Sequence, residues 1–228
     1  CIIRRTGSLL NIDGDRETGI IVILTEVEME TGKYCDIAED FIHGEHFKCG
    51  SFVCIEPDVV VGDDVKLGNH VVLKSGTRFK NQIDFADYCK TTGLCIIGNN
   101  VNVRTGATIS KSVIVEDKAF IGPGIMTNHT RNVGHQRSIA KVFLLTRIRY
   151  ASIIGSTVSI RAGMTICANA IVGAGAVVVK DLMEPGVYMG YPAVKTAELP
   201  EGYFVPGESA PYMFSPDDIN KYLQYLKV

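Results

Sequence analysis

Apolar residues recur at every sixth position along most of this chain. From Ile37 to Ile121 every sixth residue is apolar except His43 and Thr91, and a second ladder of the same period runs from Ile148 to Val178. A helix repeats near 3.6 residues and a half-buried strand near 2, so neither pattern keeps a register of six over this length. A short repeat at a fixed period indicates stacked, nearly identical structural units.

The fourth place of each six-residue unit is the second regular feature. It holds residues that tolerate positive φ: Asp40, Asp58, Asp64, Gly76, Asn100, Gly106, Gly124, Gly163, Asn169, Gly175 and Asp181. Each unit therefore predicts a short strand followed by a tight corner. Three such units per coil predict coils of about eighteen residues, beginning at Ile37, Ile55, Leu73, Thr91, Ile109, Ile148 and Ile166. The pattern is less clean in segment 80–96, where we expect a distorted coil.

The repeat divides the chain into three parts. Residues 1–36 do not join the ladder, and the β-branched run Ile20–Leu24 predicts a strand or hairpin there. Residues 37–183 form the predicted β-helix, with the register broken by a loop insertion at 128–147. Residues 184–228 follow as a turn and a closing helix, predicted over 216–227 because Ser215 is a good N-cap before Pro216. We expect this helix to cap the open end of the solenoid or to pack on a neighbouring subunit.

Composition narrows the functional classes. The 228 residues carry a net charge of -2 without a dense basic stretch, which argues against nonspecific nucleic-acid binding. The sequence has no apolar run of the roughly 20 residues that span a membrane. Seven cysteines occur without a Cys-x-x-Cys pair, which favours free thiols in a reducing, cytoplasmic compartment. We expect a cytoplasmic protein with neither a nucleic-acid nor a membrane partner, and no bound metal.

The end of the repeat carries a family resemblance. The stretch from Val172 to Asp181 and the turn Gly190-Tyr191-Pro192-Ala193, together with the ladder, resemble the bacterial hexapeptide-repeat acyltransferases. The resemblance covers about residues 37–195. It implies an all-β fold, a left-handed parallel β-helix, assembled as a homotrimer that uses acetyl-CoA. The handedness comes from this likeness alone, because ordinary parallel crossovers are right-handed.

The same resemblance assigns coenzyme A contacts. Ser156 and Ala174 match positions whose backbone meets the pantetheine arm, and Lys180 matches a residue beside the adenosine phosphates. Pro192 matches the residue that shapes the adenine pocket. Lys195 lies near a position where the family often has a basic residue, although Val194 intervenes. Corner packing alone would also explain the small residues.

A second stretch, Gly122 to His129, resembles the segment that leads into the active-site loop of sugar-nucleotide N-acetyltransferases. Transfer from a thioester to an amine benefits from a base with a pKa near neutrality, so His129 is the candidate catalytic base. Asn128, Arg131 and His135 are candidates for substrate binding. An exposed, soluble loop explains these residues and the nearby Arg147 and Arg149 equally well.

The resemblance therefore implies acetyl-CoA-dependent N-acetylation of an amino sugar that is carried on a nucleotide. O-acetylation of a sugar or small acceptor is the alternative within the same class. A γ-type carbonic anhydrase would need zinc held by three histidines, for which His70, His129 and His135 are the candidates. A purely structural β-helix remains the third alternative.

Overall fold

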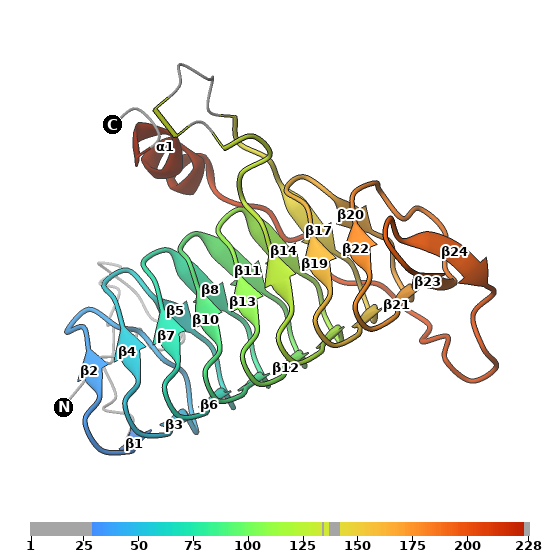
Figure 1. The fold of residues 1–228 in the computed structure, drawn as a ribbon. Helices are drawn as coiled ribbons and strands as arrows, with labels where there is room; N and C mark the ends of the chain where they lie inside the picture. Colours follow the sequence, from blue (N-terminus) through green and yellow to red (C-terminus); the bar gives the residue numbers. More distant parts are fainter. Residues whose placement is uncertain (1–28, 134, 137–141, 226–228) are drawn as a thin grey trace, which may run out of the picture.

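The computed structural model describes residues 29–133, 135–136 and 142–225. The predicted strand at 20–24 lies outside these ranges. The described chain winds into a parallel β-solenoid with one short helix, which confirms the predicted coil architecture (Figure 1). No helix in these ranges is long and apolar enough to cross a membrane.

The described strands form the three sides of the solenoid. The ten-stranded sheet contains β1 (Glu30–Thr31), β3 (Lys48–Cys49), β6 (Lys66–Leu67), β9 (Asp84–Phe85), β12 (Asn102–Val103), β15 (Phe120–Ile121), β18 (Ile153–Ile154), β21 (Ile171–Val172), β23 (Val187–Met189) and β24 (Val194–Ala197). The eight-stranded sheet contains β2 (Asp36–Ile37), β4 (Cys54–Ile55), β7 (Val72–Leu73), β10 (Lys90–Thr91), β13 (Thr108–Ile109), β16 (Met126–Thr127), β19 (Ser159–Ile160) and β22 (Val177–Val178). The six-stranded sheet contains β5 (Val60–Val61), β8 (Thr77–Phe79), β11 (Cys95–Ile97), β14 (Val113–Val115), β17 (Thr146–Ile148) and β20 (Thr165–Ile166).

Neighbouring strands are eighteen residues apart in the regular coils, as the period predicts. Leu67 pairs with Phe85, and Phe85 with Val103, all buried inside the solenoid. The fourth place of the unit adopts positive φ at most predicted positions, but Asp40 and Asp181 do not adopt it. Bulky residues that the sequence did not single out, such as Phe52 and Tyr88, adopt the same conformation (φ 59° for both). Position in the repeat therefore sets the corner conformation more strongly than residue type.

Two expectations about the early coils were wrong. The coil at 80–96 is regular, because β9 and β10 pair in register with β12 and β13. The polar ladder residue Thr91 is only 1% exposed, and its Oγ1 lies 2.7 Å from Thr77 Oγ1 and accepts a hydrogen bond from the Lys74 N–H. A hydrogen-bonded threonine thus replaces an apolar side chain without disturbing the coil.

The solenoid also begins earlier than residue 37, since β1 already pairs with β3.

The C-terminal segment after the last coil returns along the side of the solenoid instead of capping its end. We call residues 203–225 the strap. Its Tyr212 and Phe214 cover Ile96 and Ile114, the outward-facing residues of β11 and β14, which explains why these strands are apolar on both faces. The helix α1 (Pro216–Tyr225) ends the strap beside β5 and β8 (Figure 1).

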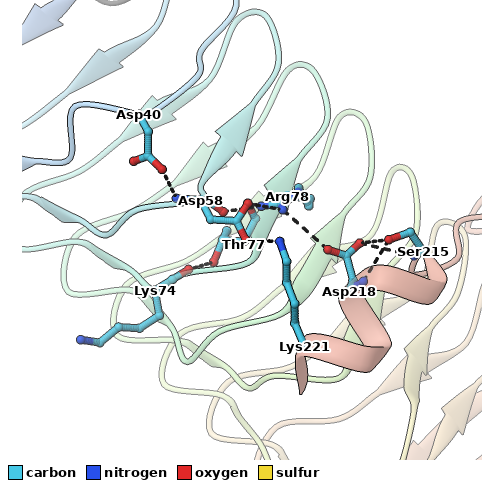
Figure 2. A network of polar contacts seen from close by, with 8 residues as sticks. All are labelled: Asp40, Asp58, Lys74, Thr77, Arg78, Ser215, Asp218 and Lys221. Carbon is cyan, nitrogen blue, oxygen red and sulfur yellow. Dashed lines mark hydrogen bonds and ion pairs between the residues drawn. The ribbon is translucent and has the colours of Figure 1, made fainter. Parts of the chain in front are cut away.

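Polar contacts fix the helix against the early coils, as Figure 2 shows. The Ser215 Oγ accepts a hydrogen bond from the Asp218 N–H at 3.1 Å, which confirms the predicted N-cap. Arg78 on β8 lies 2.6 Å from the Asp58 carboxylate and 3.7 Å from that of Asp218. Lys221 lies 3.8 Å from Asp58. The helix is thus held on the side of the solenoid by an ion-pair network.

Candidate functional site

The register breaks at the corner that follows the eight-stranded sheet. Thr127 pairs with Ile160, where an uninterrupted eighteen-residue period would place residue 145. The chain leaves the solenoid after Thr127 and rejoins it at β17, so Thr146 and Arg147 belong to a strand and not to the predicted loop. We call the corner between the eight- and six-stranded sheets the loop corner.

The start of the loop is held firmly. The Thr127 Oγ1 accepts a hydrogen bond from the Ser110 N–H at 2.7 Å, and the side chain is buried. Asn128 donates from both its backbone N–H (2.9 Å) and its Nδ2 (3.0 Å) to the carbonyl of Ile160. Both bonds use donor groups of Asn128 and not its amide oxygen. The next residue, His129, is therefore attached to a rigid support.

His129 is half-buried and stands one coil above Lys111, because Thr127 and Ile109 occupy the same ladder position in consecutive coils. Burial, and secondly the positive charge of Lys111, lower the pKa of the His129 imidazole below its ordinary value of 6.5. The ring is therefore neutral at pH 7 and able to accept a proton. Sequence reasoning missed Lys111, although the eighteen-residue period would have placed it beneath His129.

Other predicted residues of this region have different surroundings. Arg131 and His135 are exposed on the loop. Arg147 and Arg149 both lie 3.6 Å from the buried carboxylate of Glu116, and this ion pairing explains them without a substrate. His70 is stacked between Phe52 and Tyr88 on another corner, so one chain does not bring it to His129 and His135. Within the described ranges, no group of three potential ligands is arranged to hold a metal ion.

At the corner between the ten- and eight-stranded sheets, the hydrogen bonding of the backbone N–H groups differs between early and late coils. We call this corner the aromatic corner. In its early coils, the N–H groups of Lys33, Ser51 and Asn69 each donate to a side-chain oxygen of the next coil, at 2.6–3.0 Å. In the later coils the same column is occupied by Thr105, Pro123, Ser156 and Ala174. Among the described residues, nothing accepts a hydrogen bond from the N–H of Ser156 or Ala174.

The predicted coenzyme A residues fall into two groups. Ser156 and Ala174 lie in consecutive coils of the aromatic corner, where Ser156 is half-buried and Ala174 is exposed. The turn containing Pro192 lies at the same end, because Gly190 accepts from, and Ala193 donates to, the backbone of Val177. Lys180 is exposed on the loop corner, at the other edge of the eight-stranded sheet.

Lys195 belongs to β24 and is engaged by the protein itself. Its Nζ lies 2.9 Å from the Glu198 carboxylate and 3.7 Å from that of Glu184. A phosphate at Lys195 would have to compete with both carboxylates. The arrangement therefore favours Lys180 over Lys195 as a phosphate partner.

Comparison with known proteins gives structural similarity without a family match. No family model matches the sequence. The acetyltransferase domain of PglB from Neisseria gonorrhoeae, in complex with acetyl coenzyme A, is 23% identical with a TM-score of 0.41, covering 63% of this chain and 57% of that one. The polySia-specific acetyltransferase NeuO is 14% identical with a TM-score of 0.42, covering 86% of this chain and 98% of that one.

A variant of perosamine N-acetyltransferase from Caulobacter crescentus, in complex with CoA and GDP-perosamine, is 18% identical with a TM-score of 0.37. The alignment covers 73% of this chain and 58% of that one. This chain thus spans a little over half the length of the PglB domain and of the perosamine enzyme. With TM-scores below 0.5 these comparisons carry no argument about this chain, so its function has to be inferred from its own residues.

Proposed function

We propose that the protein transfers an acetyl group from acetyl-CoA to the amino group of a nucleotide-linked sugar. The observation that carries this proposal is His129, an imidazole with a lowered pKa that follows the break in the coil register after Thr127 and is attached to the hydrogen-bonded Asn128. An amine attacks a thioester only as the free base, and a neutral imidazole accepts its proton as the bond forms. Acetyl moves from the CoA sulfur to the amine nitrogen, and CoA leaves as the thiol.

Two backbone donors support the coenzyme part of the proposal. Pantetheine carries two amide groups, and their carbonyl oxygens can accept from the Ser156 and Ala174 N–H groups. Lys180 lies across the eight-stranded sheet from these donors, at the loop corner, and packing of one subunit against the next would bring the two corners to one coenzyme molecule. We propose a homotrimer in which the aromatic corner of one subunit faces the loop corner of the next.

The test is CoA release from acetyl-CoA in the presence of dTDP-, UDP- and GDP-linked amino sugars. Each is paired with the same nucleotide sugar bearing a hydroxyl group, which separates N- from O-acetylation. His129→Ala should lower kcat by about a thousandfold, within the range for loss of a general base. His46→Ala is the matched control, because His46 is exposed on another corner and paired with Asp64 at 2.9 Å. Unchanged turnover in His129→Ala would refute the base assignment.

Subunit mixing tests the trimer. Ala174→Pro removes a backbone donor, and Pro123 in the same column shows that this corner accommodates proline. If each site uses two subunits, mixing His129→Ala and Ala174→Pro subunits after partial denaturation should give more activity at low acetyl-CoA than the sum of the two separate variants, because sites with both native groups form. Light scattering should give three chains per particle. A monomer, or no regain of activity, contradicts the shared site.

A further inference from the structure

Four rings are stacked along the outside of the aromatic corner. Tyr34, Phe52, His70 and Tyr88 occupy the fourth place of four successive coils, with positive φ of 56–59°. Their ring centroids are 5.2, 4.8 and 4.9 Å apart, and the last two pairs are parallel within 4°. This spacing matches the separation of adjacent strands, so the coil repeat itself sets the stack.

The stack ends at Tyr88 with one ring face uncovered. The next two places in the column are Gly106 and Gly124, which have no side chain, and Tyr88 is 61% exposed. A Cβ added to Gly106 would meet nothing within 4 Å. The first side chain beyond them is Thr157, whose Cγ2 is 3.5 Å from the Cβ position of Gly124. The column therefore has an empty space, which we call the ring slot, where a further planar ring would continue the stack.

Polar groups beside the ring slot suit a nucleotide better than an apolar ring. The N–H groups of Asp87 and Thr105 have no acceptor among the described residues, whereas the N–H of Asn69, one coil earlier, donates to Asp87. Arg104 flanks the slot with a half-exposed guanidinium, 3.6 Å from the Asp84 carboxylate. Unused donors match the acceptor atoms of a base edge, and a guanidinium matches a phosphate.

The ring slot lies at the same height along the solenoid as His129, the proposed catalytic base. Gly106 belongs to the coil of Lys111, and Gly124 to the coil that ends at His129. In a trimer with parallel solenoids, the slot of one subunit lies level with His129 of the next. The proposed coenzyme groups Ser156 and Ala174 lie in later coils. A base in the slot would thus belong to the acceptor.

We propose that the bare face of Tyr88 and the space over Gly106 bind the base of a nucleotide, with its phosphates against Arg104. This inference rests on the proposed function for its place in the reaction, but binding itself can be measured without acetyl transfer. The shared chemistry is a nucleotide, which occurs both in coenzyme A and in a nucleoside-diphosphate sugar.

The experiment is calorimetric titration of the full chain with UDP, GDP, dTDP and CoA, each without acetyl-CoA. Tyr88→Ala should raise the Kd of the preferred nucleotide about tenfold or more, as expected for loss of one base–aromatic stack. Tyr88→Phe keeps the ring and should bind as the unaltered protein does. Gly106→Tyr should fill the slot and abolish binding while Tyr88 is still present. Four aromatic residues with similar φ in this column indicate that the fold tolerates it, and circular dichroism checks this.

The outcomes separate the alternatives. A loss confined to UDP, GDP or dTDP assigns the slot to the acceptor, and a loss confined to CoA assigns it to the coenzyme. Unchanged Kd values in Tyr88→Ala and Gly106→Tyr overturn the proposal, as does a change of oligomeric state without any nucleotide binding. Nucleotide binding that depends on Tyr88, without acetyl transfer to any amino sugar, keeps the slot and refutes the proposed function. Acetyl transfer to an amino sugar that does not depend on Tyr88 keeps the proposed function and refutes the slot.

Discussion

The six-stranded sheet and the late coils of the aromatic corner are two surfaces of the same solenoid with opposite properties. The strap covers the sheet, its outward residues Ile96 and Ile114 are buried, and Tyr212 and Phe214 pack on them. None of the described residues covers the late aromatic corner in this way, and it carries glycines, a bare ring face and N–H donors without an acceptor among those residues. The chain thus covers one surface itself and leaves the other open. Substitutions on the covered surface should change stability, and those on the open corner should change binding.

Phe214→Ala should have the largest effect on stability. Phe214 is 8% exposed and packs edge-on against Phe143, with ring centroids 6.1 Å apart. Removing the ring leaves a cavity over the sheet and should lower the free energy of unfolding by about 3 kcal/mol. Urea denaturation measures the change. Met213→Ala is the matched control, since Met213 is adjacent and 74% exposed, and its unfolding free energy should stay within about 0.5 kcal/mol.

Tyr212→Phe tests the polar part of the same surface. The Tyr212 O–H donates to the Asp117 carboxylate at 2.6 Å and accepts from Asn99 Nδ2 at 2.8 Å. Loss of a hydrogen bond to a charged group should cost about 1.5–2 kcal/mol, with little change in CoA binding. Equal stability of Tyr212→Phe and the unaltered protein would mean that the strap is held by its apolar contacts alone.

Ala174→Pro, on the late aromatic corner, should change the binding of CoA instead of the stability of the fold. It removes one N–H, so the Kd for CoA should rise about fivefold, as expected for a neutral hydrogen bond worth about 1 kcal/mol. Ala174→Ser keeps the N–H and serves as the control in the same calorimetric titration. If both variants bind CoA equally well, the backbone donor plays no part in coenzyme binding.

Lys111→Gln should give the smallest effect, visible in the pH profile. The positive charge of Lys111 disfavours the imidazolium form of His129, so its removal should raise the pKa of the imidazole. The acidic limb of kcat/KM should then move to higher pH, with a loss of activity at pH 6 and little change at pH 8. An acidic limb that does not move would show that burial alone lowers the pKa of His129.

The sequence by itself determined the coil. A six-residue apolar ladder from Ile37 to Ile121 cannot be buried by a helix or a flat strand, so the period alone predicts stacked strands and eighteen-residue coils. The same period located the break after Thr127, because a lost register is visible without any structure. The N-cap at Ser215 was equally readable, since capping depends on residues three apart.

Only the tertiary structure decided what covers which surface. The direction of the strap depends on contacts between residues far apart in sequence, such as Tyr212 with Asp117 and Asp218 with Arg78, and local patterns carry no information on them. The eighteen-residue period already aligns Lys111 with His129 and the four rings from Tyr34 to Tyr88 with one another, but only the stacked coils show that these side chains interact. The physical reason is that periodicity specifies the backbone of a solenoid, whereas its outward side chains acquire their partners only when the coils are stacked.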